Sequence, residues 1–133
     1  MENNLDFDAT KTDLVIMLNF IGAMNLGFAL QLIDNDGQTL LWNPSITGQN
    51  PKNTPNGIII KLPLPAGTTL AYFEGKGLAL EYVFRGLDVA KLPNYQINVS
   101  FLQNGVEVIN GKFSITGKLT GVKQRNSMFI SLT

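Results

Sequence analysis

Alternation of apolar and polar residues between Tyr95 and Leu119 constrains the fold more than any other feature of this 133-residue chain. Successive side chains of a β-strand point to opposite faces, so such a stretch predicts strands with one buried face. The predicted buried face consists of Tyr95, Ile97, Val99 and Phe101, and the opposite face mainly of Gln96, Asn98, Ser100 and Gln103. Asn104-Gly105 and Asn110-Gly111 interrupt the alternation, and such pairs supply the positive φ angles that tight hairpins require. The stretch therefore predicts a β-meander with two hairpins.

Short apolar segments separated by turn residues occupy the rest of the chain. Strands are predicted at 14–21, 26–33, 39–42, 58–62, 68–74, 78–85 and 126–132. A total of about nine or ten short strands is typical of sandwiches and barrels. We expect an all-β, two-sheet antiparallel β-sandwich. A small β-barrel is the alternative, but residues 14–20 lack the uniform alternation that a barrel interior requires.

The segment from Leu14 to Ile33 contains no charged residue and is long enough to cross a bilayer as a helix. Three amide side chains, Asn19, Asn25 and Gln31, interrupt it, and in hydrocarbon each amide needs a partner that one isolated helix lacks. We interpret the segment as two strands joined by a turn, and expect no membrane span.

The length of the chain is typical of one domain, which we place at residues 13–133 after a flexible segment at residues 1–12. The first eight residues are acidic where a secretory signal is basic, so no signal peptide is expected in the chain as given. A cytoplasmic protein and a mature exported chain both agree with this sequence.

Composition excludes several classes of function. Ten acidic and ten basic residues cancel, which disfavours nucleic acid and anionic lipid as partners. The chain has no cysteine and no histidine, so disulfides, thiolate zinc sites and Ser-His-Asp triads are excluded. We expect no cofactor.

Charge is distributed unevenly along the chain. Residues 1–50 contain six carboxylates against Lys11 alone, whereas residues 112–125 contain four cations and no acid. One interpretation of this distribution is that it steers head-to-tail assembly. The simpler interpretation, which we prefer from the sequence, is that strands from both ends of the chain are neighbours and their charges partly neutralise.

Two pairs of acidic residues have the composition of a chemical site. Asp34 and Asp36, in the run Asp34-Asn35-Asp36-Gly37, offer oxygen ligands for calcium, but Ser45 stands where an EF-hand has its bidentate Glu, so a hairpin turn is preferred. Glu74 and Glu81 flank a Gly-Lys-Gly turn and would face each other across a hairpin, as the carboxylates of a glycosidase do. Solubility of the strand ends is the preferred interpretation of that pair.

An aromatic and amide-rich region is the best candidate for a ligand site. Aromatic faces stack on sugars, and side-chain amides both donate to and accept from hydroxyls. The candidate residues are Trp42, Asn43, Gln49, Asn50, Asn53 and Asn56 in or beside the loop 43–57, with Tyr72 and Tyr95. The alternative is that Trp42 belongs to the core and that the asparagines only form turns.

The first functional hypothesis is a non-catalytic β-sandwich that binds another protein or forms homo-oligomers through strand edges and an apolar patch. A carbohydrate-binding module that uses the loop 43–57 is the alternative. A hydrolase that works without histidine is the third, since carboxylates alone support some hydrolysis. No known family is recognised in the residues.

Overall fold

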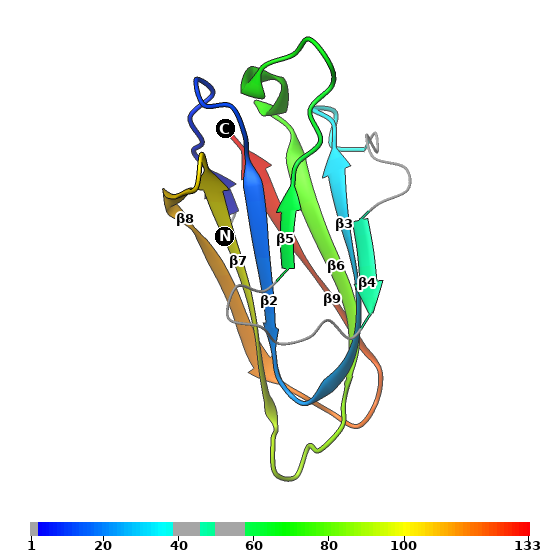
Figure 1. The fold of residues 1–133 in the computed structure, drawn as a ribbon. Helices are drawn as coiled ribbons and strands as arrows, with labels where there is room; N and C mark the ends of the chain where they lie inside the picture. The colour runs from blue at the N-terminus through cyan, green and yellow to red at the C-terminus, as the bar shows by residue number, and fades with distance from the viewer. Residues whose placement is uncertain (1–2, 39–45, 50–57) are drawn as a thin grey trace.

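A computed structural model describes residues 3–38, 46–49 and 58–133 of the chain, drawn in colour in Figure 1. These residues form nine strands and one short 3-10 helix. The strands are β1 (Asn3–Leu5), β2 (Val15–Ile21), β3 (Met24–Ile33), β4 (Ile46–Gln49), β5 (Ile58–Lys61), β6 (Gly77–Gly86), β7 (Asn94–Gln103), β8 (Val106–Lys118) and β9 (Gln124–Leu132), and the 3-10 helix is η1 (Leu70–Phe73).

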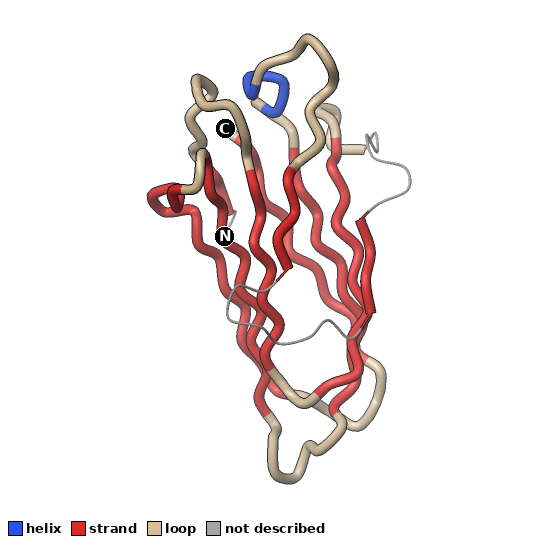
Figure 2. Tube along the Cα trace, viewed as in Figure 1, coloured by secondary structure: helices blue, strands red, loops and turns tan. Residues whose placement is uncertain are grey.

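The strands form two sheets packed face to face (Figures 1 and 2). The five-stranded sheet has the order β1-β9-β6-β3-β4, and the four-stranded sheet has the order β5-β2-β7-β8. Neighbouring strands are antiparallel, except that β1 runs parallel to β9. The predicted all-β class and two-sheet sandwich are confirmed, and the described strands do not close into one barrel.

The core between the sheets follows the alternation of the sequence. The four residues predicted on the buried face of β7 are each at most 7% exposed. The charge-free segment forms β2 and β3, one in each sheet, with every second side chain buried. The rings of Phe20 and Phe28 lie 5.2 Å apart across this core. The strand interpretation of the charge-free segment is therefore confirmed.

The N-terminal segment packs against both sheets. Within the segment 1–12, predicted to be flexible, the described residues 3–12 contribute β1 beside β9 and place Leu5 and Phe7 in the core. Gln103, predicted on the polar face, is buried because its amide exchanges two hydrogen bonds with the Asp8 backbone: Asp8 N–H donates to Oε1 at 2.8 Å, and Nε2 donates to the Asp8 carbonyl at 2.9 Å.

The strand predicted at 68–74 is wrong, because Leu70–Phe73 form the 3-10 helix η1. Leu70 and Phe73, three residues apart, are the buried residues of this helix. A turn of 3-10 helix places residues i and i+3 on one side, so this spacing suits it better than strand alternation does.

The second predicted hairpin, at Asn110-Gly111, is also wrong. β8 continues along β7 through this pair, and Phe101 alone faces the four residues Val108–Gly111, which form a bulge. Asn110 has the expected positive φ of 58°. Beyond the bulge, Phe113 and Ile115 pair with Val99 and Ile97, so the apolar faces of both strands stay aligned.

The predicted strand 39–42 lies outside the described residues. Within the region 43–57, which the sequence suggests is one long loop, Ile46–Gln49 form β4 at the edge of the five-stranded sheet.

Chain connections gather at two opposite ends of the sandwich (Figure 1). The β2–β3, β6–β7 and β8–β9 connections lie at the lower end, at residues 22–23, 87–93 and 119–123. The loop 34–38, residues 62–76, the hairpin 104–105 and residues 6–13 lie at the upper end. This arrangement decides where the charged side chains lie.

Candidate functional site at the charged ends

The two ends of the sandwich carry opposite charge. The cations of the lower end, called the basic end, are Arg85, Lys91, Lys118, Lys123 and Arg125, against Asp88 as the acid there. The acids of the upper end, called the acidic end, are Asp6, Asp8, Asp13, Asp34, Asp36, Glu74 and Glu107, against Lys11, Lys61 and Lys76. Charges that cancel in the whole chain are thus separated along the long axis of the molecule.

The structure confirms one part of the preferred interpretation of the charge pattern, because β1 and β9, from the two ends of the chain, are neighbours. It corrects the other part, the expected neutralisation of charge. Within the described ranges, ion pairs join Lys76 Nζ to Asp34 Oδ1 at 3.9 Å and Lys112 Nζ to Glu107 Oε1 at 3.5 Å. Neither pair links an acid of residues 1–50 to a cation of residues 112–125. The two regions do not neutralise each other, because they lie mainly at opposite ends.

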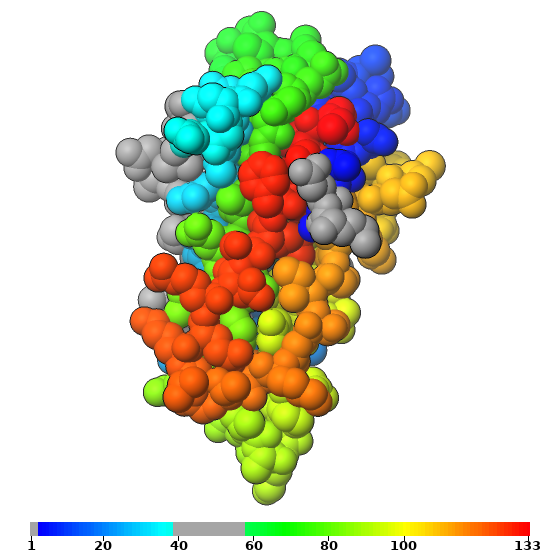
Figure 3. All heavy atoms as spheres, turned by 180° about the vertical axis from the view of Figure 1, so that it is seen from behind, coloured from blue at the N-terminus to red at the C-terminus, as the bar shows by residue number. Residues whose placement is uncertain are grey.

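A groove of about 760 Å³ lies on the outer face of the five-stranded sheet, toward the basic end. Strand register explains its shape, because Gly27, Val83 and Arg125 are aligned across β3, β6 and β9, and Ala29 is aligned with Glu81 in the next outward row. Gly27 and Ala29 on β3 have small side chains, so the surface is lower there than at the longer side chains beside them. Figure 3 views the molecule from the side opposite to Figure 1 and shows this outer face.

Three cations line this groove: Arg85, Lys123 and Arg125. Arg125 lies opposite Val83, and Arg85 is two residues further along β6, so the guanidinium groups lie on one face in diagonal positions. Among described residues none of the three cations has a carboxylate within ion-pair distance. Guanidinium groups recognise carboxylates and phosphates through paired hydrogen bonds, so the groove suits an anionic partner group.

Exposed apolar side chains accompany the cations at the basic end. Leu87, Leu92 and Val122 are 63%, 54% and 69% exposed, and Ile21 at the end of β2 is 39% exposed. Backbone hydrogen bonds tie their loops together, from Leu87 N–H to the Ala23 carbonyl at 2.9 Å and from Gly86 N–H to the Thr120 carbonyl at 2.8 Å. Apolar side chains held in such a position favour contact with another surface.

Carboxylates of the acidic end are held by local hydrogen bonds. Asp8 Oδ1 accepts from the Thr10 hydroxyl at 2.6 Å and from the Thr10 N–H at 2.9 Å. These bonds hold the pKa of Asp8 below its ordinary value, because they stabilise the charged form of its carboxylate. Asp13 Oδ1 accepts from Asn104 N–H at 2.7 Å, which ties residues 6–13 to the β7–β8 hairpin.

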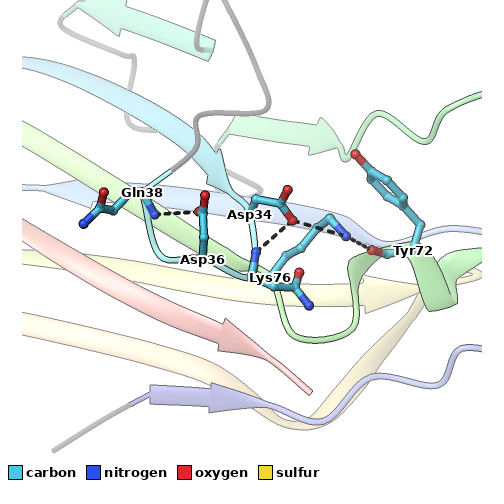
Figure 4. A network of polar contacts seen from close by, with 6 residues as sticks. Asp34, Asp36, Gln38, Tyr72 and Lys76 are labelled. Carbon is cyan, nitrogen blue, oxygen red and sulfur yellow. Dashed lines mark hydrogen bonds and ion pairs between the residues drawn. The ribbon is translucent and has the colours of Figure 1, made fainter.

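Asp34 and Asp36 form the predicted turn (Figure 4). Gly37 N–H donates to the Asp34 carbonyl at 2.9 Å, and Gln38 N–H donates to Asp36 Oδ1 at 2.8 Å. The cation beside Asp34 is Lys76, whose ammonium also donates to the Tyr72 carbonyl and lies 4.1 Å from the centre of the Tyr72 ring. In the part of the chain that the structure describes, no three acidic side chains gather as a metal site.

Glu74 and Glu81 do not face each other across a hairpin, because η1 replaces the strand expected before Glu74. Glu74 lies at the acidic end, whereas Glu81 pairs with Ala29 and Ser127 in the five-stranded sheet. The structure therefore excludes the carboxylate pair that a glycosidase requires at these two positions.

The predicted sugar-binding residues do not come together among the described ranges. Trp42, Asn43, Asn50, Asn53 and Asn56 lie outside the described residues. Gln49 ends β4, with its backbone paired to Gly27. Tyr72 lies at the acidic end, whereas Tyr95 lies near the basic end and is 7% exposed, so these two tyrosines do not share a surface.

The chain matches no protein-family model, no curated protein and no solved structure. In the described ranges no helix has the length and apolar character needed to cross a membrane.

Proposed function

We propose that this protein is a non-catalytic building block that self-associates head to tail, with the basic end of one copy against the acidic end of the next. The observation that carries the proposal is the separation of charge along the sandwich. Two molecules with this arrangement attract each other when they are aligned end to end and repel each other when like ends meet.

Apolar residues at both ends support the same contact. Leu87, Leu92 and Val122 accompany the cations, and Val106 and Ile109, which are 70% and 85% exposed, accompany the acids beside the β7–β8 hairpin. Complementary charges bring the unlike ends together and fix their orientation, and the exposed apolar side chains add surface that is buried when the ends meet. Each end offers both kinds of side chain.

A contact between unlike ends is heterologous, so each copy leaves one end free for the next. Such contacts produce rings when the rotation between copies closes, and open filaments when it does not. The absence of histidine and cysteine from the whole chain agrees with a role that needs no general base or nucleophile of these types.

Sedimentation velocity at two ionic strengths tests this function. In about 0.01 M salt, where the Debye length is about 30 Å, we expect species heavier than the 14.6 kDa monomer, increasing with protein concentration. In about 1 M salt, where the Debye length is about 3 Å, we expect a shift toward the monomer. Lys112→Arg, which keeps a cation midway along β8 beside Glu107, controls for substitution itself and should behave like the wild type. A protein that is monomeric at low salt and high concentration would refute the proposal.

A further inference from the structure

The outer edge of β9 is only partly covered. β1 pairs with Ile130–Leu132 alone, and in the described ranges no strand lies on that side of the preceding residues, Gln124 to Met128. Figure 3 shows the blue N-terminal residues between β9 and β8 in the upper half of the molecule. Below β1 the edge has no described partner strand.

Hydrogen bonds identify which backbone groups face this edge. Phe129 C=O accepts from Asn3 Nδ2 at 3.5 Å, and Thr133 N–H donates to the Leu5 carbonyl at 2.9 Å, so the odd-numbered residues of this strand face β1. Backbone groups alternate along a strand, so the N–H and C=O of Arg125 and Ser127 face the same edge. Ser127 N–H donates to Asn126 Oδ1 at 2.8 Å, a side-chain bond that replaces a neighbouring strand.

Inward-facing positions beside this edge are incompletely covered. Asn126 pairs with the buried Tyr82 and so belongs to the core face, yet it is exposed. Across the sandwich, Phe113 and Ile115 pair with the core residues Val99 and Ile97 but are only half-buried. Above them Leu5 of β1 provides the cover, since its Cδ1 lies 3.3 Å from the position of a Cβ on Gly111.

We infer that this edge accepts an extended segment of another polypeptide, which adds to the five-stranded sheet in line with β1 and covers Phe113 and Ile115. Strand addition of this kind obtains affinity from main-chain hydrogen bonds and specificity from alternate side chains. Arg125 places a cation on this edge strand itself, on the outer face of the sheet. The segment that fits carries apolar residues at inward positions and acidic residues at outward positions.

The N-terminal segment of this chain provides a model for such a ligand. In the order Met1-Glu2-Asn3-Asn4-Leu5-Asp6-Phe7-Asp8, its apolar residues alternate with acids. Within the structure Leu5 and Phe7 are buried while Asp6 and Asp8 are exposed. A free peptide with this sequence is therefore a suitable probe, and a peptide of the same composition with Leu and Phe adjacent is its matched control.

Amide hydrogen exchange of the labelled protein, measured with each peptide, tests the assignment in about 1 M salt, where end-to-end association is suppressed. We expect the alternating peptide to slow exchange of the Arg125 and Ser127 amides several-fold and to leave Asn126 and Met128, which face β6, unchanged. The control peptide should have no effect. Unchanged exchange at Arg125 and Ser127 with up to about 1 mM alternating peptide would overturn the assignment.

Two variants and two further outcomes complete this test. Ser127→Pro removes an outward N–H that the β6 ladder does not use. In this variant the alternating peptide should no longer slow exchange of the Arg125 amide. Ile115→Ser reduces the covered apolar surface and should weaken the effect of the peptide. Protection that increases with protein concentration without peptide would make a second copy the occupant and overturn the assignment, as would exchange changes confined to the β1 pairing at Ile130–Leu132.

Discussion

The ring of Tyr95 lies across Gly117, the residue directly paired with it on β8, so that a Cβ at Gly117 would lie 2.7 Å from Cε1 and 2.8 Å from the hydroxyl oxygen. Tyr95 also packs against Phe84, with ring centres 4.8 Å apart. A buried ring held on both sides cannot move away from an added methyl group. Gly117 thus shapes the core near the basic end.

Gly117→Ala should lower the free energy of unfolding by about 1 to 3 kcal/mol, the usual range for overpacking a core. Gly77→Ala is the matched comparison, because the Phe129 ring lies over Gly77 in the same way but is 48% exposed and can turn toward solvent. We therefore expect a smaller loss for Gly77→Ala. Urea unfolding of both variants measures the difference, and equal losses would contradict this explanation.

The bulge in β8 predicts opposite effects of two substitutions at Asn110. This residue has a φ of 58°, which costs about 1 to 2 kcal/mol for a residue with an ordinary side chain. Asn110→Ala should destabilise the protein by about 1 kcal/mol, while Asn110→Gly should be neutral or slightly stabilising. Thermal unfolding tests the pair, and an extended conformation with negative φ at Asn110 would reverse the order.

Lys76 should stabilise the corner between η1 and the loop 34–38. Its ammonium contacts Asp34, the Tyr72 carbonyl and the Tyr72 ring (Figure 4). Lys76→Met keeps most of the apolar stem but loses these contacts, and should cost about 1.5 to 3 kcal/mol, the range for hydrogen bonds to charged groups. Chemical unfolding measures this loss, and an unchanged midpoint would show that the contacts contribute little.

Stability should fall at alkaline pH through Tyr82. Burial raises the pKa of Tyr82 above its ordinary value of 10.0, and the neighbouring Tyr95 raises it further. The folded protein therefore keeps this proton where the unfolded chain has released it, so the contribution is complete below pH 10.0 and is lost as the pH rises above it. Above pH 10.0 the free energy of unfolding of the wild type should fall, relative to that of Tyr82→Phe, by up to about 1.4 kcal/mol per pH unit. Identical pH profiles would contradict this assignment.

The sequence predicted correctly those strands in which every second side chain is apolar and packs into the core. The buried faces of β7 and β9 follow from every second residue, because tertiary packing and local pattern agree there. Alternation failed at residues 68–74, where Leu70 and Phe73 share one side of a 3-10 helix instead. The hairpin predicted at Asn110-Gly111 is also wrong, because positive φ is common to hairpins and bulges and does not distinguish them.

The candidate site was less predictable, because it depends on which strand ends meet in space. The cations of residues 112–125 were visible in the sequence, but only strand order separates them from the acids of residues 1–50. Arg85 joins them through the β6–β9 register, which no local pattern reveals. Gly27 and Ala29 alternate with Leu26, Phe28 and Leu30, and that pattern of small outward residues was a signal for the groove floor.

Mixing two variants tests head-to-tail association most directly. Arg85→Gln/Lys123→Gln/Arg125→Gln removes three of the five described cations of the basic end, and Asp6→Asn/Asp36→Asn/Glu74→Gln removes three of the seven described acids of the acidic end. Each triple substitution lowers the net charge of its end from four to one. At low salt each variant alone should sediment as the 14.6 kDa monomer, since one of its two contact surfaces is missing. An equimolar mixture should form 1:1 dimers and nothing larger, because only one pair of intact ends remains. A mixture that stays monomeric while the wild type associates, or a single variant that associates like the wild type, would contradict contact between unlike ends.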